Sequence, residues 1–302
     1  MTVAFALSGG ANLGPMQAGA VTALLEAGIT PDLLVGSSVG ALNSGFLASR
    51  PGLAGARALE EAWVRFRRRE AFRFSLAGAI AGFVGLRDHL LSTERLRTTI
   101  RRWVQFERIE DAAVRLAVVA TDALSGAPVV IEAGDAVEAL VASAAIPGIF
   151  PAVRYGEHWL VDGTLSAGCP ALQAQELGAD TVYVITTKTA PRRRPPRGAV
   201  AMAMHTVSLV TAARTAEQLA TAHRRAERAG TAVFVVPTGE PEAPGPFDFR
   251  HGRRLFDAAY RRAARWLEER SGSPRRLEAR ETPTTPVAPA GTSGETLSHA
   301  KP

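Results

Sequence analysis

The chain has 302 residues, of which 46% are hydrophobic and 21% charged, with a net charge of +6. This composition is typical of a soluble globular protein, and the length suits one large domain or two small ones. The single cysteine, Cys169, excludes an internal disulfide scaffold and fits a reducing compartment.

The amino-terminal stretch 1–7 has no basic region and reads directly as a strand, so we interpret it as part of the fold and not as a signal peptide. The longest weakly polar stretch, 75–86, is too short to span a bilayer. We therefore expect a cytoplasmic protein. Its basic surplus favours anionic surfaces, and without a nucleic-acid motif we prefer peripheral contact with phospholipid headgroups and expect no nucleic acid. The oligomeric state is left open.

The first predicted strand, 3–7, leads into the loop Ser8-Gly9-Gly10-Ala11-Asn12-Leu13-Gly14 and then a helix over 15–27. Glycines at 9, 10 and 14 let the backbone approach a ligand and direct its N–H groups at a negative atom. A nucleotide phosphate loop is the competing interpretation. It is disfavoured because no Gly-Lys-Ser/Thr follows and Ala11 breaks the G-x-G-x-x-G pattern.

The second predicted strand, 33–35, ends at Gly36-x-Ser38-x-Gly40, after which a helical pattern begins at Val39. This spacing is typical of a nucleophile elbow, where a serine occupies a sharp strand-to-helix turn. The alternative is an ordinary glycine-rich turn. Because successive parallel strands end at the same sheet edge, we expect the loop 8–14 to place N–H donors near Ser38, as an oxyanion hole requires.

Residues 53–104 are predicted to form a helical insertion, with helices over 53–66 and 92–104. Arg65, Arg67, Arg68, Arg69 and Arg73 cluster near phenylalanines within it. They would contact a membrane or form a substrate flap, or else form a solvated basic face.

Strands are predicted over 116–120 and 127–132, around a turn that begins at Asp122. Asp122 is a candidate catalytic carboxylate, but a strand-end aspartate before a glycine turn is more often a turn former. A helix capped by Asp135 follows, and then the apolar loop 145–151, which would line an acyl-chain pocket or pack in the core.

A short strand from His158 then delivers Asp162 onto a glycine turn. Beyond it we predict a helix over 172–177, a strand over 181–186, a long helix over 199–229, a strand over 232–236 and a final helix over 251–270. From residue 271 the composition is typical of a disordered tail. Alternating strands and helices indicate an α/β fold with a mostly parallel sheet.

Three segments in this order resemble the patatin-like phospholipase family: the glycine-rich loop 8–14, Ser38 within Gly36-Ser37-Ser38-Val39-Gly40, and Asp162 within Val161-Asp162-Gly163-Thr164. The stretch 142–151 also resembles family sequence, and the likeness covers roughly 3–240. It implies a three-layer α/β/α catalytic domain over 1–240, with the segment 247–270 as a carboxyl-terminal helix packed on it and 271–302 as a tail.

The resemblance also implies chemistry. Ser38 and Asp162 would form a catalytic dyad that cleaves fatty-acyl esters, and the oxyanion hole would consist of Gly9, Gly10, Ala11 and Asn12. No metal or other cofactor is expected. Departures from the family pattern are Ala11, Leu13 and Thr164; Ala11 is tolerable at a negative φ.

Two alternatives follow from the residues. A triad in the order Ser38, Asp162, histidine would use His205, His223 or His251 as base. A protein of another class, a catalytically weak or inactive lipid-binding scaffold on the same fold, would account for the three departures.

Overall fold

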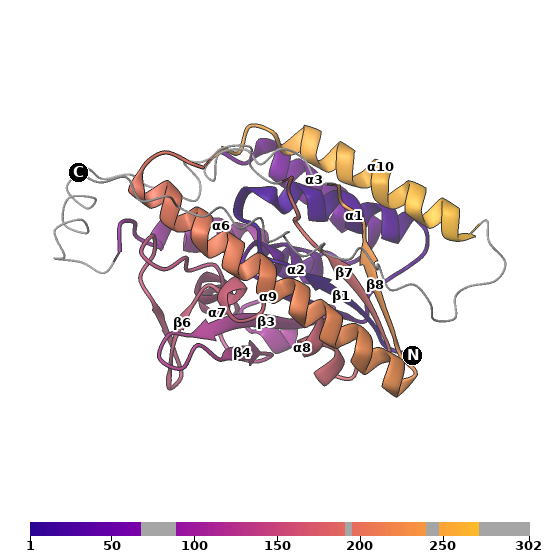
Figure 1. Cartoon of the computed structure of the whole chain (residues 1–302), viewed down its shortest axis with the longest axis horizontal. Helices are drawn as coiled ribbons and strands as arrows, with labels where there is room; N and C mark the ends of the chain where they lie inside the picture. The colour runs from indigo at the N-terminus through magenta and orange to yellow at the C-terminus, as the bar shows by residue number, and fades with distance from the viewer. Residues whose placement is uncertain (68–88, 191–194, 240–247, 272–302) are drawn as a thin grey trace, which may run out of the picture.

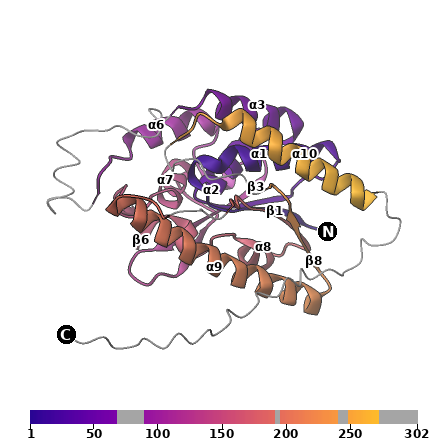
Figure 2. The ribbon, with the colours of Figure 1, turned by 45° about the horizontal axis from the view of Figure 1, so that its top comes forward.

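In the computed structural model a central sheet lies between two layers of helices (Figure 1). The structure describes residues 1–67, 89–190, 195–239 and 248–271. Turning the molecule shows α1, α3 and α10 on one face of the sheet and α8 and α9 on the other (Figure 2). The three-layer α/β/α architecture predicted from the sequence is thereby confirmed.

The sheet has the strand order β5-β6-β3-β2-β1-β7-β8, and β4 pairs with β3. The strands are β1 (Val3–Leu7), β2 (Leu33–Ser37), β3 (Arg115–Asp122), β4 (Pro128–Ile131), β5 (Val153–Tyr155), β6 (His158–Val161), β7 (Thr181–Ile185) and β8 (Ala232–Val236). The five strands from β3 to β8 along this order pair in parallel. The strands β4, β5 and β6 form antiparallel pairs beside them.

The helices are α1 (Gly14–Glu26), α2 (Val39–Ser49), α3 (Gly52–Arg65), α6 (Glu94–Trp103), α7 (Ala136–Ser143), α8 (Ala171–Glu176), α9 (Ala199–Ala229) and α10 (Gly252–Ser271). Single 3-10 turns occupy Ala11–Leu13, Ile109–Asp111 and Gly163–Leu165. Most predicted elements are therefore found within two or three residues of their expected limits.

Strand β1 shows how the sequence builds both faces of the sheet. Phe5 and Leu7 pack in the cluster formed with the α1 layer, whereas Ala4 and Ala6 pack in the cluster formed with α8 and α9. Side chains alternate between the two faces of a strand, and parallel sheets covered on both sides are hydrophobic at every position. This accounts for the uninterrupted apolar run of β1.

The carboxyl-terminal helix α10 packs closely on α1. A Cβ added at Gly19 would lie 2.4 Å from the Phe256 carbonyl oxygen, so only glycine permits this approach. The Tyr260 hydroxyl donates to Glu26 at 2.6 Å. Hence α10 covers one face of the sheet together with α1.

Strand β5 was not predicted, and it forms an antiparallel hairpin with β6. The expected insertion 53–104 is helical at both ends, and α3 packs on α1, since Gly14 lies against the Trp63 ring. Its centre, with Arg68, Arg69 and Arg73, and the tail 272–302 lie outside the described residues.

None of the helices in the described ranges combines the length and apolarity needed to cross a membrane.

Candidate active site

Ser38 occupies a strained turn between β2 and α2. Its backbone has φ 52° and ψ −125°. Residues other than glycine seldom adopt a positive φ, and those that do are often found at functional sites. A Cβ added at Gly36 would lie 2.4 Å from the Gly40 carbonyl oxygen, and one at Gly40 would lie 2.2 Å from the Leu7 carbonyl oxygen. The predicted sharp turn is present, and both glycines are needed because backbone passes directly against them.

The turn brings Ser38 to Asp162. Ser38 Oγ donates to Asp162 Oδ2 at 2.6 Å, and both residues are buried, 5% and 4% exposed. Strand β6 runs antiparallel to β3, with Val161 opposite Thr121, and so returns the chain to the edge where β2 ends. The second carboxylate oxygen, Oδ1, accepts the Thr164 N–H at 2.9 Å. Both carboxylate oxygens of Asp162 therefore accept a hydrogen bond.

Burial raises the pKa of the Asp162 carboxyl above its usual range, because the charged form is removed from water. The hydrogen bonds from Ser38 and Thr164 oppose this effect by stabilising the carboxylate. A raised pKa makes Asp162 a stronger base than a solvated aspartate, as proton transfer from a hydroxyl requires.

Ser143, at the end of α7, fixes the backbone of the turn. Its hydroxyl accepts the Ser38 N–H at 2.9 Å and donates to the Val119 carbonyl at 2.7 Å. Ser143 is fully buried. Its role was not predicted, since a serine within an alanine-rich helix carries no local signal of a partner 105 residues away.

The glycine-rich loop lies between two threonines. A Cβ added at Gly9 would lie 1.9 Å from Thr164 Oγ1, and one at Gly10 would lie 2.0 Å from Thr187 Oγ1. Thr187 also donates from its hydroxyl to the Gly9 carbonyl. The loop is therefore held beside the turn that carries Asp162, as expected from the shared sheet edge.

The four residues proposed for the oxyanion hole differ in what their polar groups do. The Gly9 N–H donates to the Gly168 carbonyl at 3.2 Å, and the Asn12 side chain donates to the Asp248 carbonyl at 2.8 Å. Within the described ranges, the N–H groups of Gly10 and Ala11 donate to no protein acceptor. The backbone N–H groups of Gly10 and Ala11 are thus available to donate hydrogen bonds to a ligand.

Ala11 does not meet the condition set for it in the sequence analysis. Its φ is 48°, in the left-handed region, and not negative. An L-residue pays roughly 1–2 kcal/mol for this conformation. The loop keeps a backbone shape typical of glycine although the sequence supplies alanine.

A buried polar network supports the glycine-rich loop 8–14. Gln17 Nε2 donates to the Ser8 carbonyl at 2.6 Å, Asn43 Nδ2 donates to Gln17 Oε1 at 2.8 Å, and Trp63 Nε1 donates to Asn43 Oδ1 at 2.8 Å. These contacts join the loop to α1, α2 and α3. Local sequence patterns could not indicate this network, because each bond joins segments that are separate in the chain.

Asp122 is a turn former and does not join the site. Its Oδ1 accepts the N–H groups of Leu124 and Ser125, and its Oδ2 lies 2.8 Å from His158 Nδ1. These bonds, led by the Ser125 N–H, hold the pKa of the Asp122 carboxyl well below its usual range. Asp122 therefore stays ionised and would be a poor base.

No histidine of the described residues hydrogen-bonds Ser38 or Asp162. His223 Nδ1 contacts the Leu219 carbonyl at 2.8 Å, and His251 lies 3.3 Å from Asp248. These contacts offer no support to the triad alternative.

The apolar loop 145–151 packs into the core through Ile149 and Phe150, which are buried. An apolar cavity of about 310 Å³ lies elsewhere, near Pro31 and Val114, which precede β2 and β3. It is at the edge of the sheet opposite Ser38. The loop 145–151 does not line it.

Fold and site together define a three-layer α/β protein whose buried serine, on a strained strand-to-helix turn, is hydrogen-bonded to an aspartate. The family model described as patatin-like phospholipase matches residues 5–174, more than half of the sequence. The chain belongs to the patatin-like phospholipase family.

Solved structures similar to the chain include VipD from Legionella pneumophila, with 14% identity, a TM-score of 0.48, and coverage of 89% of this chain and 67% of VipD. The type III effector protein ExoU shares 14% identity at a TM-score of 0.39, with coverage of 90% and 54%. The heterodimeric complex ExoU-SpcU from Pseudomonas aeruginosa matches with 16% identity and a TM-score of 0.39, and the match covers 90% of this chain and 52% of the chain in the complex. The chain therefore spans about half the length of the ExoU chains.

Proposed function

We propose that the protein is a serine lipid acyl hydrolase of the phospholipase A or esterase type, which cleaves fatty-acyl esters with Ser38 as nucleophile and Asp162 as base. The observation that carries the proposal is the 2.6 Å hydrogen bond from Ser38 Oγ to Asp162 Oδ2 at a strained turn. Membership of the family supports lipid esters as the substrate class.

In the acylation step, Ser38 Oγ attacks the ester carbonyl carbon while Asp162 takes the hydroxyl proton. The tetrahedral intermediate then expels the alcohol, which receives that proton from Asp162, and the acyl group remains on Ser38. General base catalysis by a positioned side chain contributes roughly 10²–10⁴-fold. The raised pKa of Asp162 suits this role, because its carboxylate binds the proton more tightly than a solvated one.

The negative oxygen of the intermediate needs hydrogen-bond donors. The N–H groups of Gly10 and Ala11 are the donors of the loop that have no protein acceptor in the described residues. A third donor is the N–H of Val39, at the first position of α2, where helix geometry leaves the N–H without an intrahelical acceptor. One such donor contributes about 3 kcal/mol in serine hydrolases.

In the second step, water attacks the acyl-enzyme and gives a proton to Asp162. The carboxylic acid leaves, and Ser38 regains its proton from Asp162. Every proton moves between Ser38, Asp162, water and substrate, so the residues present suffice for this cycle.

The test is hydrolysis of a p-nitrophenyl acyl ester by the wild type and by Ser38→Ala and Asp162→Asn. We expect both variants to lose turnover while their circular dichroism spectra stay unchanged. Equal rates for the wild type and Ser38→Ala would refute Ser38 as nucleophile. Turnover retained in Asp162→Asn would refute Asp162 as the base.

A second candidate function, a catalytically weak or inactive lipid-binding scaffold, is favoured by the strained φ of Ala11 at the centre of the loop. A fluorophosphonate probe separates the two, because it labels only an activated serine. Labelling that Ser38→Ala abolishes supports the hydrolase. Absence of labelling in the wild type, with vesicle binding preserved, supports the scaffold.

A further inference from the structure

The amino-terminal half of α9 exposes large hydrophobic side chains. Met202, Val207, Leu209 and Val210 are 40%, 48%, 58% and 63% exposed. Leu209 and Val210 follow Met202 by seven and eight residues, so these three side chains share one helix face, with Val207 beside it. We call these four residues the α9 apolar face. Contiguous exposed apolar surface of this kind marks an interaction site.

This face is close to the candidate active site. Arg214 donates to the Leu165 carbonyl at 3.1 Å, and Gln218 donates to the Ser166 carbonyl at 2.7 Å. Thr215 lies against Gly168. The middle of α9 therefore packs on the segment that directly follows the Asp162 turn.

The rest of the helix extends past the sheet edge that carries Ser38. α9 begins after β7 ends and returns to the start of β8, which is parallel to β7. Its amino-terminal end thus points to the carboxyl edge of the strands. Residues 199–210 precede the packed segment, and at about 1.5 Å per residue they extend roughly 18 Å beyond it.

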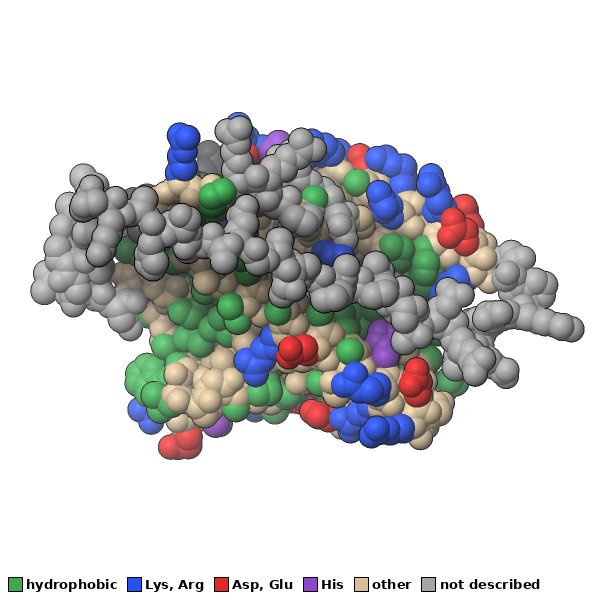
Figure 3. Space-filling model, in the orientation of Figure 1, with side chains coloured by type: hydrophobic (Ala, Val, Ile, Leu, Met, Phe, Trp, Pro, Cys, Tyr) green, Lys and Arg blue, Asp and Glu red, His purple; other side chains and the backbone are tan. Residues whose placement is uncertain are grey.

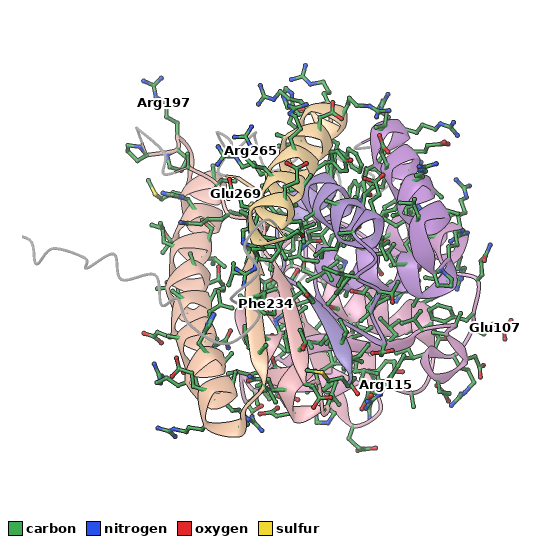
Figure 4. The ribbon with its side chains drawn as sticks, turned by 90° about the vertical axis from the view of Figure 1, so that its right-hand side faces the viewer. Glu107, Arg115, Arg197, Phe234, Arg265 and Glu269 are labelled. Atoms are coloured by element: carbon green, nitrogen blue, oxygen red, sulfur yellow. The ribbon has the colours of Figure 1, made fainter. Side chains whose placement is uncertain are left out.

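The charged residues nearest to the face in the sequence are basic on both sides. Between residues 186 and 214 the sequence contains six basic residues and no acidic one, and 199–213 has no aspartate, glutamate, lysine or arginine. Arg197, exposed just before α9, projects away from the body of the protein (Figure 4). In Figure 3 hydrophobic side chains gather at the left, over β6 and α7, and exposed Trp159 belongs to β6.

We propose that the α9 apolar face lies on the surface of an anionic phospholipid membrane, with Arg197 and Arg214 contacting the headgroups. An uncharged apolar helix face bordered by arginines matches the chemistry of such an interface. The inference rests on the proposed function, since it names the surface from which the substrate would reach Ser38. It assigns that role to α9, and not to the arginines near residue 70 considered from the sequence.

The experiment measures co-sedimentation with vesicles of phosphatidylcholine alone and of phosphatidylcholine mixed with phosphatidylglycerol. The tested variant is Leu209→Glu/Val210→Glu, whose two side chains are exposed, so the fold should tolerate it. The matched control is Ala220→Glu/Ala229→Glu, which adds the same charge on exposed positions of the same helix. Ala220 lies about 15 Å from Val210 along the axis.

We expect the wild type, Ser38→Ala and the control to bind the mixed vesicles, and binding of Leu209→Glu/Val210→Glu to fall at least about tenfold. Its hydrolysis of a water-soluble short-chain ester should equal that of the wild type. Because Ser38→Ala is included, membrane binding is read independently of catalysis, and failure of the proposed hydrolase activity would appear only in the ester assay.

Three results would overturn the inference. Unchanged binding of Leu209→Glu/Val210→Glu would remove the face from the interface. Equal binding to both vesicle types would remove the anionic headgroup. A wild-type dimer that becomes a monomer in Leu209→Glu/Val210→Glu, with no vesicle binding by either, would assign the face to a second copy of the chain.

Discussion

The hydroxyl of Ser143 holds the backbone N–H of Ser38 at 2.9 Å and thereby anchors the strained turn to the neighbouring strand β3 through Val119. The φ of 52° at Ser38 persists only while its surroundings hold it. Two buried backbone groups, one donor and one acceptor, depend on this single hydroxyl.

Ser143→Ala should therefore lower both stability and turnover. Each backbone group left without a partner costs about 1–3 kcal/mol, and a loosened turn misplaces Ser38 Oγ. Thermal denaturation and ester hydrolysis measure the two effects. Ser37→Ala is the matched control, because the buried Ser37 hydroxyl has no hydrogen-bond partner, and its removal should change neither quantity. Equal behaviour of the two variants would contradict the anchoring role.

The dependence of kcat/KM on pH should carry an acidic limb from Asp162. The carboxyl must be ionised to accept the Ser38 proton, and burial raises its pKa above the ordinary value of about 3.9. We expect activity to decline as pH falls through a midpoint above that value. The measurement uses a substrate without titratable groups, so that the pH dependence of kcat/KM reports groups of the enzyme. A limb centred at or below the ordinary value would argue against Asp162 as the base.

The same burial predicts how stability responds to removing the charge. The native chain holds the Asp162 proton more tightly than the unfolded chain, so the group opposes folding once pH rises above its raised pKa. Asp162→Asn should thus melt at the same or a higher temperature than the wild type at neutral pH. The difference should shrink as pH falls towards about 3.9. Asn keeps an acceptor for the Thr164 N–H, and a clear loss of melting temperature would disprove the expectation.

The contact between Gly9 and Thr164 predicts a compensating pair of substitutions. Gly9→Ala would place its Cβ 1.9 Å from Thr164 Oγ1 and displace the loop, and a shift of about 1 Å can cost about 10²-fold in rate. Adding Thr164→Gly removes the obstacle and keeps the N–H that Asp162 accepts. Turnover should recover in the double variant relative to Gly9→Ala. Thr164→Gly alone serves as control, and additive losses would sink this interpretation.

The sequence was most informative where glycine and proline mark the ends of elements. β1 and α9 have the predicted limits, and the turn at Ser38 was recognisable because Gly36 and Gly40 flank it. Placing Ser38 beside Asp162 required the family resemblance, since the two residues are 124 positions apart.

What the sequence could not predict depends on long-range packing. Strand β5, Val153–Tyr155, has only three residues, which is too short for a hydrophobic alternation to be recognised in the sequence. Ser143 and Thr187 were missed because their partners belong to distant segments. The left-handed φ of Ala11 was missed for a different reason: alanine rarely adopts it, and here the flanking contacts of Gly9 and Gly10 fix the loop.

The position of β7 next to β1 has a practical consequence for shortened fragments. The segment matched by the family model ends at residue 174, before β7 and β8 begin. A fragment trimmed there would turn β1 into a bare outer strand, although Ala4–Leu7 are fully buried in the intact chain. Unpaired hydrophobic edge strands pair with other molecules, so such a fragment should aggregate, whereas one that extends through α10 keeps β1 paired with β7.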